Sequence, residues 1–110
     1  MTKKEQLYFL LNGMDNGEIE INTFINQFIK IFDLEIDYDE LSKDEYTILG
    51  NVSDMAARFS DSEEDLKLPN VYYSEKQIRE EVTRSLEAFA KSFGAGERRH
   101  IKRDFIQILK

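Results

Sequence analysis

The side chains in this sequence that are best suited to chemistry are carboxylates, and they gather in the middle of the chain. Residues 33–65 hold twelve aspartate or glutamate residues against two basic ones, Lys43 and Arg58. Within the stretch from Asn51 to Val82, the acidic loop at residues 60–65 is followed by the tyrosine pair Tyr72 and Tyr73, and this stretch is the candidate binding surface. A surface of this kind attracts a basic partner and repels the phosphates of nucleic acid. The plain alternative is a charged face that only solubilises the domain.

The sequence offers little for catalysis. General acid–base chemistry needs titratable groups held together in a cleft, and the only histidine, His100, has no neighbouring nucleophile. Carboxylates bind magnesium, but no spacing selects a set of them. The turn after residue 12 fails as a calcium loop, because Met14 and Thr23 fall where oxygen ligands and a bidentate glutamate are required. We therefore predict a protein that is not an enzyme and has no cofactor.

Length and composition indicate one ordinary globular domain. The chain has 110 residues and a formal net charge of −7. At this length a hydrophobic core forms without disulfides or a structural metal. It contains no cysteine, which excludes disulfides and fits a reducing cytosol. No apolar run approaches the roughly 20 residues that span a membrane. The N-terminal residues lack the apolar segment of a signal peptide, so we expect a cytoplasmic protein that binds no membrane.

Hydrophobic residues recur at helical spacing in four stretches. They predict helices at residues 3–13, 20–32, 41–59 and 74–92. Three of these helices begin with a capping box, in which Ser or Thr is followed three residues later by Glu or Gln; the capping residues are Thr2, Ser42 and Ser74. No alternation with a period of two predicts a strand.

The connections between these helices are expected to be short. The acidic stretch 33–40 lacks a helical stripe and predicts a connection. The stretch 60–65 and Pro69 predict a loop, and the first helix should stop near Asn12-Gly13. Gly50 lies inside the third helix, where it costs about 1 kcal/mol relative to alanine. A helix tolerates this cost, and a kink at Gly50 is the alternative. Amphipathic helices joined in this way predict an all-α, antiparallel four-helix bundle over residues 1–93. Its core should contain Phe24, Phe28, Leu49, Phe59, Val82, Leu86 and Phe89.

The tail at residues 94–110 differs from the rest of the chain. It carries five basic residues against two acidic ones and places Ile101, Phe105, Ile108 and Leu109 on one helical face. The pattern fits a fifth helix, an extension of the fourth, or a segment that depends on a partner. Its charge also suits pairing with the acidic middle of the same chain.

Several short motifs follow one another in an order that is more specific than any of them alone. They are Gly17-Glu18-Ile19, Leu41-Ser42, Ala56-Ala57-Arg58-Phe59, the acids Asp61 and Asp65, a tyrosine at 72 or 73, Glu81-Val82, and Ser85-Leu86-Glu87-Ala88-Phe89. In this order, over about residues 5–93, the sequence resembles the bacterial self-protective colicin-like immunity family. The loop between Phe59 and Tyr72 is not matched position by position, and the basic tail has no counterpart. The immunity proteins of DNase colicins are a weaker match, because the proline and glycine that precede their tyrosines are absent here.

The resemblance implies a four-helix bundle that neutralises a cognate bacterial nuclease toxin, in the family's namesake a ribonuclease that cleaves transfer RNA. In that family, acidic side chains occupy the basic site that would hold RNA phosphates. Carried onto this chain, the role falls on Asp54, Asp61, Glu63, Glu64 and Asp65. We expect a free monomer that binds the basic toxin 1:1 and binds no nucleic acid directly. The alternative is a non-catalytic regulatory or scaffold domain with a solvated acidic face.

Overall fold

The computed structural model describes residues 1–68 and 70–92, and the predicted tail at 94–110 lies outside them. Within these ranges the chain is mostly helical and has no strand, so the predicted all-α class is confirmed. The α-helices are α1 (Lys3–Asp15), α2 (Ile21–Ile29), α3 (Lys43–Ala57), α4 (Glu63–Leu66) and α5 (Glu75–Ser92). A π-helix, η1 (Lys30–Glu35), and a 3₁₀ turn, η2 (Tyr38–Glu40), join α2 to α3.

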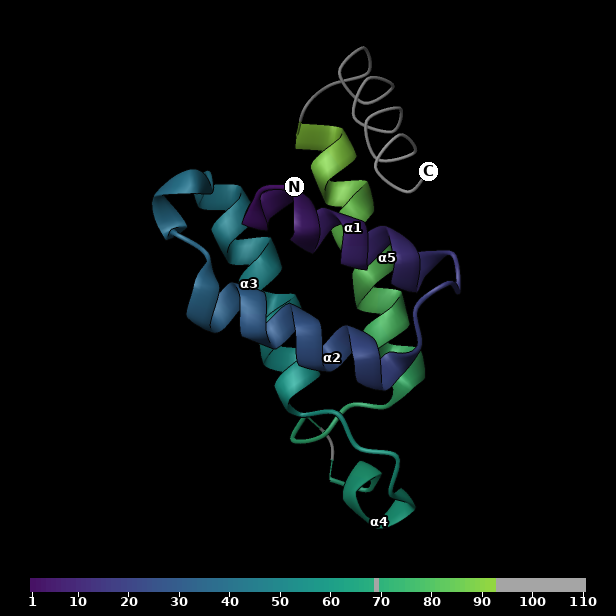
Figure 1. The fold of residues 1–110 in the computed structure, drawn as a ribbon. Coiled ribbons are helices and arrows are strands. Elements are labelled where there is room, and N and C mark those ends of the chain that lie inside the picture. The colour runs from purple at the N-terminus through teal and green to yellow at the C-terminus, as the bar shows by residue number, and fades with distance from the viewer. Residues whose placement is uncertain (69, 93–110) are drawn as a thin grey trace.

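The four longer helices form two antiparallel pairs that cross each other (Figure 1). One pair is α1 with α2, and the other is α3 with α5. Contacts also join α2 to α3 and α1 to α5, so the four long helices form a closed ring of contacts. This ring of contacts encloses one hydrophobic core, while α4 lies apart from it at the lower end of the molecule (Figure 1).

The core is built from the helical stripes that the sequence predicts. Five of the seven expected core residues are buried, namely Phe24, Phe28, Leu49, Val82 and Phe89. The other two, Phe59 and Leu86, are only partly buried and pack against the edge of the core. Phe59 lies at this edge because α3 ends before it, so its side chain no longer follows the helical stripe.

All three predicted capping boxes are confirmed. In each, the Ser or Thr hydroxyl accepts a hydrogen bond from the backbone N–H three residues later, and the side chain there accepts one from the backbone of the cap. The pairs are Thr2–Glu5, Ser42–Glu45 and Ser74–Gln77. These boxes satisfy backbone donors that would otherwise lack partners and fix where the helices begin.

The stretch at residues 33–40 connects α2 to α3 as predicted, but its first three residues belong to η1 and its last three to η2. Helix α2 passes directly into η1, which ends where the backbone N–H of Ile36 donates to the carbonyl of Ile31 over 2.9 Å. Ile31 and Phe32 remain buried in this wider turn, but Leu34 is exposed. The apolar stripe therefore stops before the helical segment does, which is why the sequence pattern missed it. The predicted loop at 60–65 likewise contains the start of the single turn α4.

Gly13 does not end a helix as the sequence suggested, whereas α3 continues through Gly50 as expected. Helix α1 does not stop near Gly13 but continues to Asp15, and the turn is made by Gly17 at φ 81°. A side chain at Gly13 would overlap Ile19, with a Cβ only 2.6 Å from its Cγ1 atom. Close packing therefore explains this glycine. Helix α3 runs through Gly50 without interruption.

Candidate functional site

The predicted acidic segment forms an excursion from the helical body. After α3, Phe59 and Tyr73 form an isolated parallel bridge. The N–H of Ser60 donates to the carbonyl of Tyr73 and the N–H of Tyr73 donates to the carbonyl of Arg58, each over 2.9 Å. The chain therefore leaves the body and returns at one neck, and α4 protrudes beyond it (Figure 1).

Of the acidic residues in this excursion, only Asp65 has a clear structural task. Its carboxylate accepts a hydrogen bond from the hydroxyl of Ser60 over 2.9 Å, and its backbone N–H donates to Ser62, which caps α4. Asp61, Glu63 and Glu64 are exposed. Because the core does not use these three carboxylates, they are accessible to a partner.

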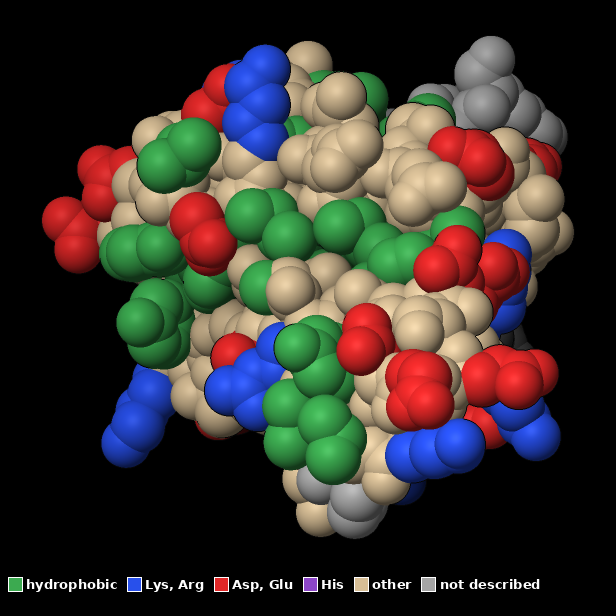
Figure 2. Space-filling model, turned by 90° about the horizontal axis from the view of Figure 1, so that it is seen from below, with side chains coloured by type: hydrophobic (Ala, Val, Ile, Leu, Met, Phe, Trp, Pro, Cys, Tyr) green, Lys and Arg blue, Asp and Glu red, His purple; other side chains and the backbone are tan. Residues whose placement is uncertain are grey.

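Basic side chains lie among the predicted acidic residues. The Nε of Arg58 is 3.6 Å from the carboxylate of Asp54, and the Nζ of Lys67 is 4.0 Å from that of Glu64. All four side chains are largely exposed, and exposed pairs of this kind contribute little to stability. In the view from below, Lys and Arg side chains alternate with Asp and Glu (Figure 2). The surface around α4 is therefore acidic but partly neutralised.

The tyrosine pair divides between structure and surface. Tyr73 is half-buried and packs against the core beside Phe59, whereas Tyr72 is half-buried at the neck. Two neighbouring side chains that the sequence analysis did not single out, Leu68 and Val71, are exposed. Hydrophobic side chains form a band across the lower face of the molecule (Figure 2). Any partner at α4 therefore meets apolar as well as acidic side chains.

A second acidic surface lies at the other end of α3, and the sequence analysis missed it as a site. The rings of Tyr38 and Tyr46 meet edge to face with centroids 5.1 Å apart. Both rest on the buried ring of Phe32, at centroid distances of 5.4 and 6.0 Å. We call Tyr38 and Tyr46 the aromatic corner, because both are exposed large side chains that rest on this buried ring. The sequence signal was a pair of tyrosines within an acidic run.

Carboxylates surround the aromatic corner. Asp37, Asp39 and Glu40 are exposed, and no ion pair joins them to a basic side chain within the described ranges. Partial burial, with the charge of Asp33 and the neighbouring Tyr46, raises the pKa of the Tyr38 phenol. The corner therefore combines exposed aromatic rings with exposed carboxylates, and the exposed Lys43 lies one helical turn before Tyr46.

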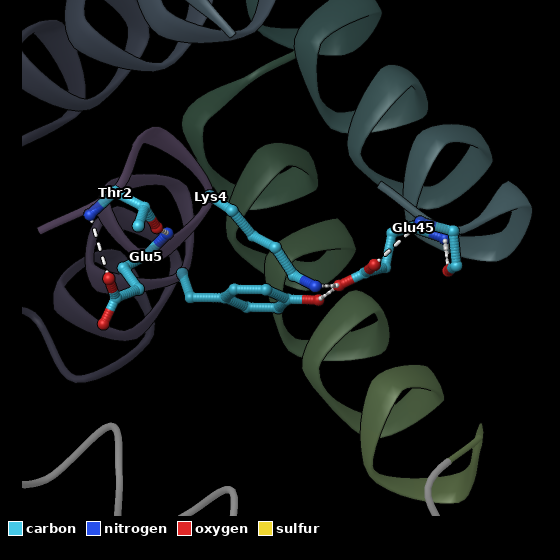
Figure 3. A network of polar contacts seen from close by, with 6 residues as sticks. Thr2, Lys4, Glu5 and Glu45 are labelled. Atoms are coloured by element: carbon cyan, nitrogen blue, oxygen red, sulfur yellow. Dashed lines mark hydrogen bonds and ion pairs between the residues drawn. The ribbon is translucent and has the colours of Figure 1, made fainter. Parts of the chain in front are cut away.

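A buried polar network joins α1 to the start of α3 (Figure 3). The carboxylate of Glu45, only 4% exposed, accepts a hydrogen bond from the Tyr8 hydroxyl over 2.6 Å and lies 2.9 Å from the Nζ of Lys4. Burial alone would raise the pKa of Glu45, but hydrogen bonds from Ser42, Tyr8 and Lys4 outweigh it and lower that pKa. Burial and the bond to Glu45 raise the pKa of Tyr8. Glu45 and Lys4 thus form an ionised pair that holds α1 against the start of α3.

The described residues do not assemble a recognisable metal site. No group of three or more His, Cys, Asp or Glu side chains among them is placed to hold a metal ion, and His100 lies outside the described residues. Arg79 of α5 has structural partners instead, since it pairs with Glu75 and donates to the Met14 carbonyl, both over 2.8 Å. Among the described helices, none has the length and apolar character needed to cross a bilayer.

Comparisons with protein-family models, with curated proteins and with solved structures each find no match to this chain.

Proposed function

We propose that this chain is an immunity protein, which binds and neutralises a basic nuclease toxin in the bacterial cytoplasm. The observation that carries the proposal is the protruding turn α4, where Asp61, Glu63 and Glu64 are exposed and the core makes no use of them. The four longer helices would correspond to the four-helix bundle of the immunity family that the sequence resembles. The protein would act by occupying the toxin's site, without catalysis or a cofactor, as a monomer that binds one toxin domain.

The physical argument is electrostatic. A nuclease site must be basic to hold phosphate, so an acidic surface can occupy it in place of the substrate. Opposite charges also steer encounter, with association rate constants of ~10⁸–10⁹ M⁻¹s⁻¹ at low salt. Tyr72, Leu68 and Val71 would supply apolar contacts among the charges. The choice of a transfer-RNA-cleaving ribonuclease as the toxin rests on the family resemblance.

One observation favours the alternative of a regulatory or scaffold domain with a solvated acidic face. The ion pairs Asp54–Arg58 and Glu64–Lys67 reduce the negative potential around α4. Both pairs are exposed and loosely formed, so a basic partner can displace their cations at little cost. An immunity protein has a cognate toxin that it binds, whereas a regulatory or scaffold domain has none, so a search for the toxin distinguishes the two functions.

The deciding experiment is co-expression of the chain with the product of the adjacent gene. The proposal expects that product to be toxic alone, to be tolerated together with this chain, and to co-purify with it 1:1. A neighbouring gene without toxicity, or a toxin that this chain neither binds nor neutralises, would overturn the proposal.

Charge reversal tests the site within that assay. Replacing Asp61, Glu63 and Glu64 by lysine should abolish growth protection, because like charges placed together at an interface cost several kcal/mol. Asp65 is left unchanged because it holds the loop through Ser60. A matched control carries the same change of charge at exposed residues elsewhere, Glu18→Lys, Glu80→Lys and Glu87→Lys, and should still protect. Equal protection by both variants would remove α4 from the site.

A further inference from the structure

The aromatic corner is an unusual surface for a small acidic domain. Tyr38 is 43% and Tyr46 is 49% exposed, and they are among the few large apolar side chains that the described surface leaves exposed. Large exposed apolar groups surrounded by charges are characteristic of interaction sites. Tyrosine is also enriched among the residues that dominate binding energy at interfaces.

The corner is rigid before any partner arrives. The two tyrosine rings rest on Phe32, which is buried, and contact each other edge to face. Phe32 in turn stacks on Phe28 in the core, with ring centroids 6.5 Å apart. Side chains that are already ordered lose little conformational entropy on binding, so the corner is suited to anchor a partner.

The charges around the corner define its occupant. Asp37, Asp39 and Glu40 are exposed around Tyr38 and have no basic partner in the described part of the chain. An arginine side chain suits these rings and carboxylates best, because its guanidinium stacks on tyrosine rings and also donates paired hydrogen bonds to carboxylates. The occupant is therefore an arginine-bearing segment of a basic protein.

Helix α3 connects the corner to the acidic turn. Tyr46 and Asp54 are both exposed on α3 and eight residues apart, which corresponds to about 12 Å along a helix. Thr47 and Asn51 are also exposed between them. A standard interface covers about 800 Å² on each partner, so one protein can contact both ends of α3 at once.

We propose that the toxin-binding surface extends along α3 to the aromatic corner, where Tyr38 and Tyr46 bind an arginine-bearing segment of the toxin. This inference rests on the proposed function and goes beyond it by assigning separate tasks to the two ends of α3. The exposed carboxylates of α4 accelerate association, whereas the corner slows dissociation. Charge placed at the rim of an interface acts mainly on kon, and buried aromatic anchors act mainly on koff.

The test is binding kinetics with a catalytically inactive form of the toxin domain encoded by the adjacent gene. The double variant Tyr38→Ala, Tyr46→Ala should raise koff by about thirtyfold or more, the factor that corresponds to an interface hot spot, with little change in kon. The variant Asp61→Lys, Glu63→Lys, Glu64→Lys should mainly lower kon. Each variant is compared with the Glu18→Lys, Glu80→Lys, Glu87→Lys control.

A second variant keeps the test informative if loss of the tyrosines unfolds the domain. Asp39 and Glu40 beside Tyr38 are exposed, so Asp39→Lys with Glu40→Lys leaves the core intact and replaces the carboxylates that the arginine segment should meet by positive charges. We expect koff to rise at least about tenfold for this variant, with the circular dichroism spectrum and melting temperature unchanged. If the wild type binds but the folded corner variants keep its koff, the corner is not part of the interface and the proposed function stands. If the wild type does not bind the toxin, both proposals fail.

Discussion

The two ends of α3 both carry acidic side chains, yet they are built in different ways. At the N-terminal end, Glu45 is buried in a network with Tyr8 and Lys4, and the exposed tyrosines rest on Phe32. At the C-terminal end, the chain leaves the body through the bridge between Phe59 and Tyr73 and forms the single turn α4. The first end is tied into the core by side chains, and the second is closed mainly by backbone hydrogen bonds.

This difference separates structural carboxylates from available ones. Glu45 has lost almost all exposure, and three neighbours satisfy its charge. Glu63 and Glu64 are exposed at α4, where Glu64 has one loose partner 4.0 Å away. A carboxylate that stabilises the fold is thus distinguished from one that can meet a partner by its burial and hydrogen bonds. Sequence position alone does not separate them.

The largest expected effect on stability comes from the core layer beneath the aromatic corner. Phe28 is fully buried and stacks on Phe32, so Phe28→Ala should lower the free energy of unfolding by about 3–5 kcal/mol. Urea denaturation followed by circular dichroism measures this change. A loss below about 1 kcal/mol would show that the N-terminal end is not anchored through the phenylalanine layer.

A smaller loss of stability is expected when one hydrogen bond to Glu45 is removed. Tyr8→Phe removes the hydroxyl that donates to Glu45 over 2.6 Å and keeps the ring, which should cost about 1.5–3 kcal/mol, as for a hydrogen bond to a charged group. Denaturation of both proteins at pH 7 measures the difference. Ser60→Ala, which removes a hydrogen bond at the other end of α3, is the matched comparison and should cost less.

The same variant predicts a dependence on pH. Because the pKa of Glu45 is lowered in the folded protein, its contribution to stability is fully present above the unfolded pKa of about 4.3. It is lost as the pH falls through the lower folded pKa. The stability difference between wild type and Tyr8→Phe should therefore shrink in that acidic range. A difference that stays constant from pH 7 down to pH 2 would contradict the ionised pair of Glu45 and Lys4.

A stabilising change is expected in the middle of α3, which links the two ends. A Cβ at Gly50 would lie 3.6 Å from the ring of Phe32, an ordinary contact, so Gly50→Ala should raise the free energy of unfolding by up to about 1 kcal/mol through helix propensity. Gly13→Ala is the control, because its Cβ would overlap Ile19 and overpacking costs about 1–3 kcal/mol. Thermal melts that rank the two variants in the opposite order would refute this reading of the glycines.

The smallest effect is expected at α4. Glu63→Gln with Glu64→Gln should change stability by no more than about 0.5 kcal/mol, because both side chains are exposed and outside the core. Urea denaturation beside Tyr8→Phe gives the contrast between the two ends. A loss comparable to that of Tyr8→Phe would mean that the α4 carboxylates have a structural task, and the distinction between the two ends would not hold.

The helical framework could be predicted from the sequence because its signals are local. The capping boxes at Thr2, Ser42 and Ser74 and the apolar stripes gave the helix starts and most of the core. The π-helical extension of α2 could not, since hydrogen bonding from Ile36 back to Ile31 leaves no pattern in an acidic segment. Gly13 was interpreted as a helix stop, because its contact with Ile19 depends on how the chain turns back.

The acidic candidate site could be predicted only as a group of residues. Sequence reasoning selected Asp61, Glu63 and Glu64, which are exposed, together with Asp65 and Tyr73, which also have structural partners. Which carboxylates are free depends on hydrogen bonds across the excursion, such as that from Ser60 to Asp65. The aromatic corner was missed because Tyr38 and Tyr46 meet only after η1 and η2 bring them together on Phe32.

The proposed function requires that an acidic surface steers this protein onto a basic nuclease toxin. The most direct measurement is the association rate constant with the inactive toxin domain over a range of ionic strength. Electrostatic steering predicts a kon that falls steeply as salt rises from about 0.01 to 0.15 M, over which the screening length shortens from about 30 to 8 Å. It also predicts a much weaker salt dependence for the Asp61→Lys, Glu63→Lys, Glu64→Lys variant. A wild-type kon that does not change with salt would contradict the claim.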